Sequence, residues 1–313
     1  MWFIYALIAT LSWGCADLFY KKGTDENDRY SYLKIAVWVG LVMGVCAFAL
    51  LPLAESGTSV LNLINLVNYA PVSLAYILSM VIGYAGMRYL EVSIISPVQN
   101  ASGAFSSLVM ILYFVAVGRI GAIADEFTVL DLVGTSVIAV GIILLAIVEK
   151  RKKIILTDEK KYHLGALALI FPLLYCLIDT IGTAADGIVL DEKTGLGLGE
   201  FDIIILYGLT FFLAGIFSWL FLLIKEKHAY NPFKEGTKGI AAAFEEFGQL
   251  FYVFAMAKQP VLVAPMVASY CIVSVILSRL FLKEKLTREQ YLCITMVILG
   301  IVALGVAEGL AEG

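Results

Sequence analysis

The sequence predicts an all-α polytopic membrane protein with ten transmembrane helices, arranged as two inverted five-helix repeats. Of the 313 residues, 61% are apolar and only 15% are charged, whereas about 25% of the residues in a soluble domain are charged. A soluble domain of this length could not bury that much apolar surface. Residues 35–53, 92–118 and 203–224 contain no charge, and an apolar run of about 18 residues can cross a bilayer. Water-soluble enzymes are therefore excluded.

Ten apolar segments of helical length follow one another along the chain. The first twenty residues lack a basic region and a cleavage site, so we interpret them as a retained helix and not as a signal peptide. His163 and His228 fall in polar connections, and we expect no metal site and no cofactor. The predicted helices cover residues 2–22, 33–53, 69–88, 92–118, 128–149, 164–185, 202–224, 238–258, 260–282 and 287–307.

Weak internal similarity divides the chain in two. A shift of 162 residues places Trp13 on Tyr175 and Asp17 on Asp179, so both helices carry an aromatic residue four positions before an aspartate. Shifts of 168 and 159 align further pairs, which are Pro97 with Pro265, Asp125 with Glu284, Thr128 with Thr287 and Gly141 with Gly300. Many transporters contain internal repeats of this kind. The predicted parts are a repeat at 1–149, a connecting segment at 150–163 and a repeat at 164–313.

The charges predict how the helices cross the membrane. Connections after the odd-numbered helices contain 19 Lys or Arg residues, while those after the even-numbered helices contain three, Arg119, Lys193 and Lys258. Because positive residues stay in the cytoplasm, both termini are expected outside it, in a multi-pass protein of the plasma membrane. Five helices per half also require the halves to be inverted.

The net charge of the chain is −4, so the chain has no excess of basic residues that could bind nucleic acid. The lipid bilayer is the expected environment, with the protein a monomer or a homodimer.

Two segments carry a family resemblance. Residues 6–23 read ALIATLSWGCADLFYKKG, with a Trp-Gly pair and trailing lysines, and residues 282–287 read LKEKLT. Both segments resemble the EamA branch of the drug/metabolite transporter superfamily. Its L-G-E-x-L-T segment is matched at Leu282, Glu284, Leu286 and Thr287, with Lys283 in place of the usual glycine. The resemblance implies a ten-helix transporter with a cavity between two inverted bundles, in a superfamily that moves amino acids, nucleotides, sugars and other metabolites.

Two aspartates are candidates for binding substrate or coupling ion, because ionisable side chains at membrane depth are costly. Asp17 lies one helical turn before Lys21, so it either forms an ion pair with this lysine or has a functional role. Asp179 has Thr183 at the corresponding position; a hydrogen bond to a neighbouring helix is the alternative to a functional role. Inversion places the two carboxylates on opposite sides of the midplane. We expect each to bind a cationic group or a proton in turn.

The helix predicted at 238–258 contains a second acidic feature. Glu245 shares a helix face with Gln249 and Tyr252, whereas Glu246 points about 100° away. Glu245 is therefore expected to face the substrate. The alternative is that both glutamates lie at the cytoplasmic interface.

Prolines are expected to kink two helices near their starts. Pro97 and Pro265 would free backbone carbonyls that line a cavity. Nearby polar side chains are candidates for substrate hydrogen bonds or for contacts between helices. They are Gln99, Asn100 and Ser102 after the first proline, and Ser269 and Tyr270 after the second. Gly40 and Gly44 form a GxxxG pattern that favours close packing within the monomer.

The combined prediction is a secondary active transporter that moves a small polar metabolite, such as an amine or amino acid, by alternating access. A proton gradient or exchange would drive it, because no ATP site is recognisable. No nucleophile, metalloprotease or P-loop motif occurs, so we expect no enzyme. Two alternatives stay open. Acidic residues at 25–28 and 191–192 could hold Mg²⁺ in a membrane prenyltransferase if they lay on the same side. A membrane scaffold would need no cavity between the halves.

Overall fold

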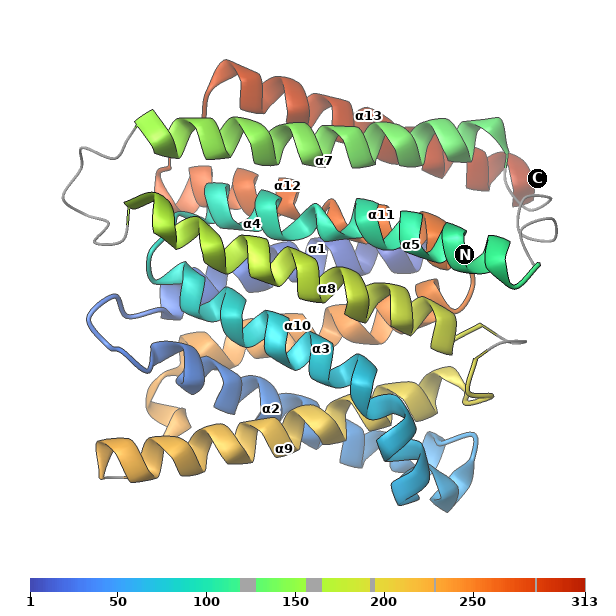
Figure 1. Cartoon of the computed structure of the whole chain (residues 1–313). Coiled ribbons are helices and arrows are strands. Elements are labelled where there is room, and N and C mark those ends of the chain that lie inside the picture. The colour runs from blue at the N-terminus through green and yellow to red at the C-terminus, as the bar shows by residue number, and fades with distance from the viewer. Residues whose placement is uncertain (119–127, 156–164, 192–194, 228, 285, 313) are drawn as a thin grey trace.

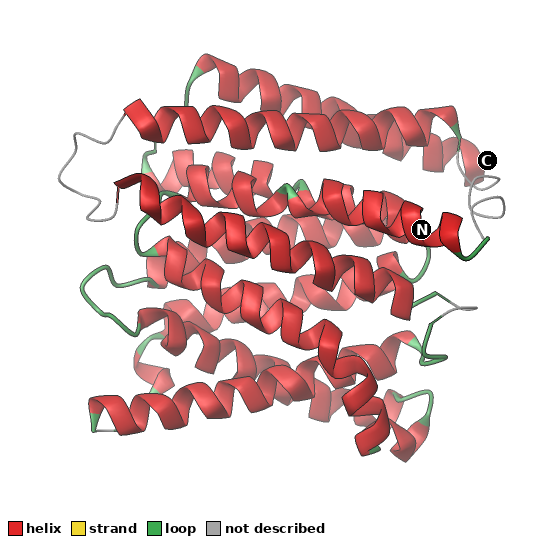
Figure 2. Ribbon diagram, viewed as in Figure 1, coloured by secondary structure: helices red, strands yellow, loops and turns green. Residues whose placement is uncertain are grey.

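All regular elements in the described part of the chain are helices (Figure 2). The computed structural model describes residues 1–118, 128–155, 165–191, 195–227, 229–284 and 286–312. The longer helices are α1 Trp2–Gly23, α2 Ser31–Leu50, α3 Leu63–Met87, α4 Val92–Asn100, α5 Ser102–Ala116, α7 Val129–Ile155, α8 Ile170–Val189, α9 Glu200–Glu226, α10 Gly236–Met256, α11 Pro260–Ala268, α12 Tyr270–Leu277 and α13 Arg288–Glu312. Short helical turns are η1 Leu51–Leu53, η2 Gly57–Leu61, η3 Gly165–Leu169, η4 Pro232–Lys234 and η5 Ser278–Leu282.

The described helices form nine candidate spans, and α10 is a tenth helix of spanning length. Within the described residues, nine spans are long and apolar enough to cross a membrane, with α4 and α5 counted as one span and α11, α12 and η5 as another. The tenth, α10, has 21 residues and is less apolar, because it carries Glu245, Glu246 and Gln249. The predicted class, an all-α polytopic membrane protein, is confirmed.

Several helix bounds differ from those predicted. Helix α3 begins at Leu63 and not at 69, because the side chain of Asn62 caps it by accepting a hydrogen bond from the Ile64 amide. Pro71 lies inside this helix. Helix α8 continues to Val189 and not to 185, which brings Asp186 into the spanning segment. Helix α7 continues past 149 to Ile155.

Two spans are broken in the middle, and both breaks lie four residues after a proline. The predicted single helices at 92–118 and 260–282 divide at Ala101 and at Ser269, one turn beyond Pro97 and Pro265. A proline lacks an N–H and crowds the carbonyl of the preceding turn, which weakens the helix there. The carbonyl freed at Val261 accepts a 2.8 Å hydrogen bond from the Ser107 hydroxyl. This carbonyl therefore joins α11 to α5, instead of lining the cavity as predicted.

The packing repeats itself between the halves. Helices α7 and α13 pair along one edge of the bundle and α2 and α9 along the other (Figure 1). Between the edges, α1 packs against α10, and α3 packs against α8 in the same way. Glycines set the distances: a Cβ on Gly40 would lie 2.7 Å from the Cα of Gly215, and one on Gly134 would lie 3.0 Å from the Gly300 carbonyl. Gly40 thus packs within the chain, as predicted.

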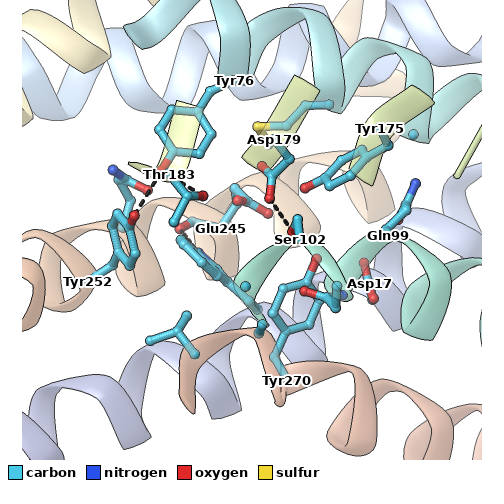
Figure 3. A pocket seen from close by; sticks show the side chains of 18 of the residues that line it. Asp17, Tyr76, Gln99, Ser102, Tyr175, Asp179, Thr183, Glu245, Tyr252 and Tyr270 are labelled. Carbon is cyan, nitrogen blue, oxygen red and sulfur yellow. Dashed lines mark hydrogen bonds between the residues drawn. The ribbon is translucent and has the colours of Figure 1, made fainter. Parts of the chain in front are cut away.

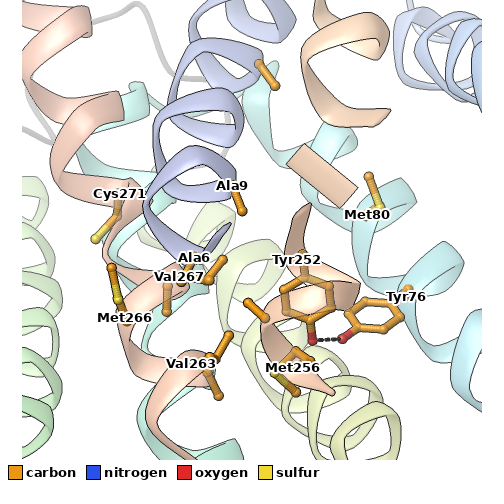
Figure 4. Packing of buried hydrophobic residues seen from close by; sticks show 14 of the residues in the cluster. Ala6, Ala9, Tyr76, Met80, Tyr252, Met256, Val263, Met266, Val267 and Cys271 are labelled. Atoms are coloured by element: carbon orange, nitrogen blue, oxygen red, sulfur yellow. Dashed lines mark hydrogen bonds between the residues drawn. The ribbon is translucent and has the colours of Figure 1, made fainter. Parts of the chain in front are cut away.

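The buried core joins helices of both halves. Ala6 and Ala9 of α1 belong to one apolar cluster with Val263, Met266 and Val267 of α11 (Figure 4). Small side chains on α1 let the two helices approach closely. This cluster packs α11 against α1, which carries Trp13 and Asp17.

Both termini lie at the same end of the bundle (Figure 1), as an even number of spans requires. The loops after α1, α3 and α9 lie at the opposite end, beside Lys21, Arg88 and Lys225. The loops after α8 and α10 lie at the end that carries the termini. Some residues of the sequence argument lie outside the described residues, namely Arg119, Asp125, Lys160, Lys161, His163, Glu192, Lys193, His228 and Lys285.

Candidate functional site

A polar cavity lies at the centre of the bundle, between α1, α3, α8, α10 and the two broken spans. About 720 Å³ of space, part of it open to the outside, lies between the lining atoms. Ser269, also a candidate from the sequence, does not line this cavity, because its hydroxyl donates to the Met266 carbonyl. Ser102 lines it. Eight further candidates line it as well, although they come from five separate spans. They are Trp13, Asp17, Gln99, Asn100, Tyr175, Asp179, Glu245 and Tyr270.

Asp17 is held by serines from both broken spans. Its Oδ2 accepts hydrogen bonds from the Ser96 hydroxyl at 2.6 Å and from the Ser274 hydroxyl at 2.7 Å. Lys21, the predicted ion-pair candidate, directs its ammonium to the carbonyls of Met87 and Leu90, at 2.6 and 3.0 Å. These hydrogen bonds tie α1 to the end of α3. Asp17 is thus solvated by hydroxyl groups at the cavity wall.

Asp179 lies across the cavity from Asp17 (Figure 3). The Ser102 hydroxyl donates to its Oδ2 at 2.6 Å. Ser102 is the first residue of α5, so the break at Ala101 places its side chain beside α8. Thr183, one turn further along α8, also faces this carboxylate. The two aspartates therefore have similar but unequal sets of hydroxyl partners.

Glu245 has a different environment. Among the described residues, no hydrogen bond or ion pair to its carboxylate is found, although the side chain is partly buried and lines the cavity. Its backbone carbonyl accepts a 3.0 Å hydrogen bond from the Trp13 indole. A buried carboxylate without a protein partner is costly, so this group is available to a ligand.

Glu246 lies on another face of α10, as predicted. It is buried and is absent from the cavity lining, and it faces Cys46 of α2. The two adjacent glutamates therefore have separate surroundings, so Glu246 serves as a reference for the effect of removing a buried charge from α10.

Aromatic rings surround the acidic groups. Trp13 stacks at a tilt on Tyr252, with ring centroids 5.1 Å apart, and meets Tyr270 edge to face at 5.8 Å. A Cβ on Gly248 would lie 2.4 Å from the Trp13 ring, so only glycine leaves room for the indole there. Tyr20 and Tyr84 close another part of the wall with centroids 4.7 Å apart.

Two amides complete the lining. Gln99 is buried, and its Nε2 has no hydrogen-bond partner among the described residues. The same is true of Gln249 Nε2. Asn100 instead donates to the Ser96 carbonyl of its own helix at 2.9 Å. The unpaired amide groups of Gln99 and Gln249 are donors that a bound molecule can use.

Sequence reasoning missed much of the wall formed by α3. Tyr76, Met80, Gly83, Tyr84 and Met87 all line the cavity. Their spacing places them on one helix face, and this pattern was available from the sequence. Tyr76 and Tyr84 indicate such a face in the sequence. A helix face in contact with lipid needs no hydroxyl groups, so tyrosines repeated on one face suggest that this face borders a polar cavity.

The resemblance segment at 282–287 has a structural role at the end of the bundle. The Glu284 carboxylate accepts hydrogen bonds from the amides of Val92 and Ser93, at 3.2 and 3.0 Å. It thereby caps the N-terminus of α4, where a negative charge is favourable. Lys283 has a φ of 59°, a left-handed conformation that glycine adopts easily. This explains why the resembling proteins have glycine there.

Comparison with known proteins agrees with this architecture. No curated protein matches the sequence significantly. A solved crystal structure of another protein matches with a TM-score of 0.58 at 12% sequence identity, over 99% of this chain and 98% of that chain. At this identity the match shows the fold alone. The model of the EamA-like transporter family matches residues 173–306. Residues 173–306 are therefore an EamA-like transporter domain, of the drug/metabolite transporter superfamily, within a multi-pass membrane protein.

Proposed function

We propose that the protein is a secondary active transporter that moves a small polar metabolite with an amino group, an amine or an amino acid, across the plasma membrane by alternating access. One observation carries the proposal. The cavity wall contains the carboxylates of Asp17, Asp179 and Glu245, and among its described lining residues there is no Lys, Arg or His. An acidic cavity attracts cations and repels anions.

The aromatic wall supports the same class of substrate. A cation held over the face of Trp or Tyr is stabilised by about 0.5–2 kcal/mol, and more strongly when water is excluded. Trp13, Tyr252 and Tyr270 provide such faces next to Glu245. An ammonium group could therefore be bound by the carboxylate while the rings contact its carbon chain.

The repeated packing supports alternating access. We take the chain as two inverted five-helix repeats, 1–149 and 164–313, joined by 150–163. The paired contacts of α1 with α10 and of α3 with α8 fit this division. Inverted repeats that surround a central site allow one half to rock against the other. The distribution of positive residues supports an orientation with both termini outside the cytoplasm.

Energy would come from a proton gradient or from exchange, with a proton as a candidate coupling ion. Asp17 and Asp179 come from corresponding positions of the two repeats and lie on opposite walls of the cavity. Each could bind the ammonium group or a proton in one orientation of the transporter.

The two alternative functions have less support. The acidic loops at 25–28 and at 191 lie at opposite ends of the bundle (Figure 1), so they cannot share the magnesium ion that a prenyltransferase would need. A scaffold has no need for a central cavity lined by three carboxylates. The cavity therefore favours a transporter over both.

Thermal unfolding of the purified protein in detergent, with ligands matched in shape but not in charge, tests the proposal. Suitable ligands are 2-phenylethylamine, phenylalanine and 3-phenylpropionate. A ligand at a hundred times its Kd stabilises the folded state by about 2.7 kcal/mol. We expect the amine or the amino acid to raise the unfolding temperature and the carboxylate to have no effect. Stabilisation by 3-phenylpropionate alone would overturn the proposal.

Two variants of α10 locate the binding site. Glu245→Gln is expected to weaken amine binding at least tenfold while leaving the unfolding temperature of the free protein unchanged or higher, since the carboxylate has no protein partner. Glu246→Gln removes the neighbouring charge outside the cavity and is the matched control. Equal effects of the two variants on binding would show that Glu245 does not contact the ligand.

A further inference from the structure

Asp186 of α8 is a buried carboxylate that lies outside the cavity, toward the end of the bundle that carries the termini. Asp186 follows Asp179 by seven residues on α8, about 10 Å along the helix axis. Together with Tyr175 and Thr183, the two aspartates form one polar stripe on this helix. Asp186 is completely buried and does not line the cavity. Asp186 is therefore not part of the proposed substrate site.

The partners of Asp186 are tyrosines. The Tyr69 hydroxyl donates to its Oδ1 at 3.1 Å, and the Tyr252 hydroxyl also faces the carboxyl group. Its Oδ2 has no hydrogen-bond partner among the described residues. The other titratable groups that face it are Tyr76 and Tyr207.

The remaining surroundings of Asp186 are apolar. Met110 of α5, Pro260 of α11 and Met256 of α10 pack around the neighbouring Gly187. No cation pairs with Asp186 in the part of the chain that the structure describes. A carboxylate without a cation in such surroundings is costly, and a bound proton removes the charge. A metal ion would need more oxygen ligands than this site offers.

A chain of hydroxyl groups connects Asp186 with the cavity. Tyr252 and Tyr76 are 2.8 Å apart at their hydroxyl oxygens, and Tyr76 lies 3.2 Å from the Thr183 hydroxyl (Figures 3 and 4). Thr183 in turn faces Asp179. The chain therefore runs from one aspartate to the other through three side chains.

Each hydroxyl has one hydrogen, so the chain has two possible directions. If Asp186 carries a proton and donates to Tyr252, then Tyr252 donates to Tyr76, Tyr76 to Thr183 and Thr183 to Asp179. If Asp186 has released its proton, every donor turns round, and Asp179 loses the Thr183 hydrogen bond. Protonation at one end thereby changes the number of donors at the other.

We propose that Asp186 is a proton-binding site, separate from the substrate cavity and linked to Asp179 by the reversible chain Tyr252–Tyr76–Thr183. The step is the binding of one proton from water to a carboxylate oxygen, with formation of an O–H bond and its return to water on release. The link to substrate rests on the proposed function; the proton site itself does not. A proton at Asp186 gives Asp179 a second hydroxyl donor, which prepares it for an ammonium group.

Infrared spectroscopy of the purified protein tests the proton site without any substrate. A buried protonated carboxyl group gives a C=O band that shifts in heavy water. At neutral pH we expect one component of this band to be lost in Asp186→Asn, in a difference spectrum against the wild type. The control is Asp202→Asn, which removes a buried aspartate of α9 whose carboxylate accepts hydrogen bonds from the Ser56 amide, and which should keep that component. Tyr69→Phe, which keeps the carboxyl group but removes its hydrogen-bond donor, should shift the band. If the spectrum of Asp186→Asn equals that of the wild type, the proton site is overturned. If Asp186→Asn does not fold, Tyr69→Phe provides the test, and an unshifted band in that variant overturns the proton site.

Calorimetric titration with 2-phenylethylamine in two buffers of different ionisation enthalpy tests the link. The number of protons exchanged on binding should be smaller in Tyr76→Phe than in the wild type, while the Asp186 band persists. Tyr230→Phe removes a buried hydroxyl outside both the chain and the cavity lining, and should keep the proton exchange. Unchanged exchange in Tyr76→Phe would overturn the link. If the amine does not bind at all but the Asp186 band is present, the proposed function fails and the proton site stands.

Discussion

The Ser274 hydroxyl of α12 donates a 2.7 Å hydrogen bond to the Asp17 carboxylate of α1, across 257 residues of sequence. Ser96 of α4 donates to the same oxygen at 2.6 Å. The carboxylate therefore holds α1 to a broken span of each half, at the wall of the cavity.

Removal of this hydrogen bond should destabilise the fold. Ser274→Ala leaves a buried carboxylate with one hydroxyl donor, and the loss of a hydrogen bond to a charged group costs about 2 kcal/mol. Thermal unfolding in detergent measures the change. Ser218→Ala is the control, because the Ser218 hydroxyl donates only to the Ala214 carbonyl of its own helix. Equal losses in the two variants would contradict the role of Ser274.

A glycine at position 283 should stabilise the protein. Lys283 has a φ of 59°, and the left-handed conformation costs an L-residue about 1–2 kcal/mol. Lys283→Gly removes that cost and is expected to raise the free energy of unfolding by about 1 kcal/mol. The same substitution at Lys225, in the last turn of α9, should lower it by about 1 kcal/mol. A loss of stability in both variants would show that the Lys283 side chain makes a contribution larger than the backbone cost.

The crossing of α2 and α9 should tolerate no side chain at position 40. A Cβ there would lie 2.5 Å from the Phe211 carbonyl and 2.7 Å from the Gly215 Cα, and backbone atoms cannot move aside cheaply. Gly40→Ala is expected to cost about 1–3 kcal/mol by overpacking. Gly309→Ala, on α13 where nothing lies within 4 Å, should be neutral or stabilising by up to about 1 kcal/mol. Denaturation curves of the two variants would be compared, and an unaffected Gly40→Ala protein would mean that the helices can separate.

Glu55 should make the stability depend on pH. Its carboxylate accepts hydrogen bonds from the first turn of α9, but burial and then the charges of Glu200 and Asp202 raise its pKa. A pKa raised by folding means that the folded state holds this proton more tightly, so its contribution to stability grows as pH falls through the folded pKa. Glu55→Gln should therefore be more stable than the wild type at neutral pH, by a margin that shrinks in mild acid. Unfolding temperatures over this pH range provide the measurement, and a margin independent of pH would contradict the prediction.

The acidic residues of the cavity show which parts of the site can be predicted from the sequence. A carboxylate at membrane depth is costly enough to be noticed from composition alone, and so Asp17, Asp179 and Glu245 were selected. Asp186 was missed because α8 was predicted to end at 185, and its cap at Leu190 has no side-chain signal. The breaks lie at Ala101 and Ser269, one turn beyond the two prolines at which the sequence predicts kinks.

The sequence by itself determined that the chain crosses a membrane about ten times and which acidic side chains lie at membrane depth. Both follow from the cost of removing polar groups from water, which depends on composition along the chain. Only the tertiary structure decided which partners these acids have. Asp17 accepts a hydrogen bond from Ser274, Asp179 accepts one from Ser102, and Glu245 has no described partner. These differences depend on contacts between spans that are far apart in sequence. Local patterns do not identify such partners: the pattern at Gly40 predicts close packing, but only the structure shows that Gly215 of α9 lies against it.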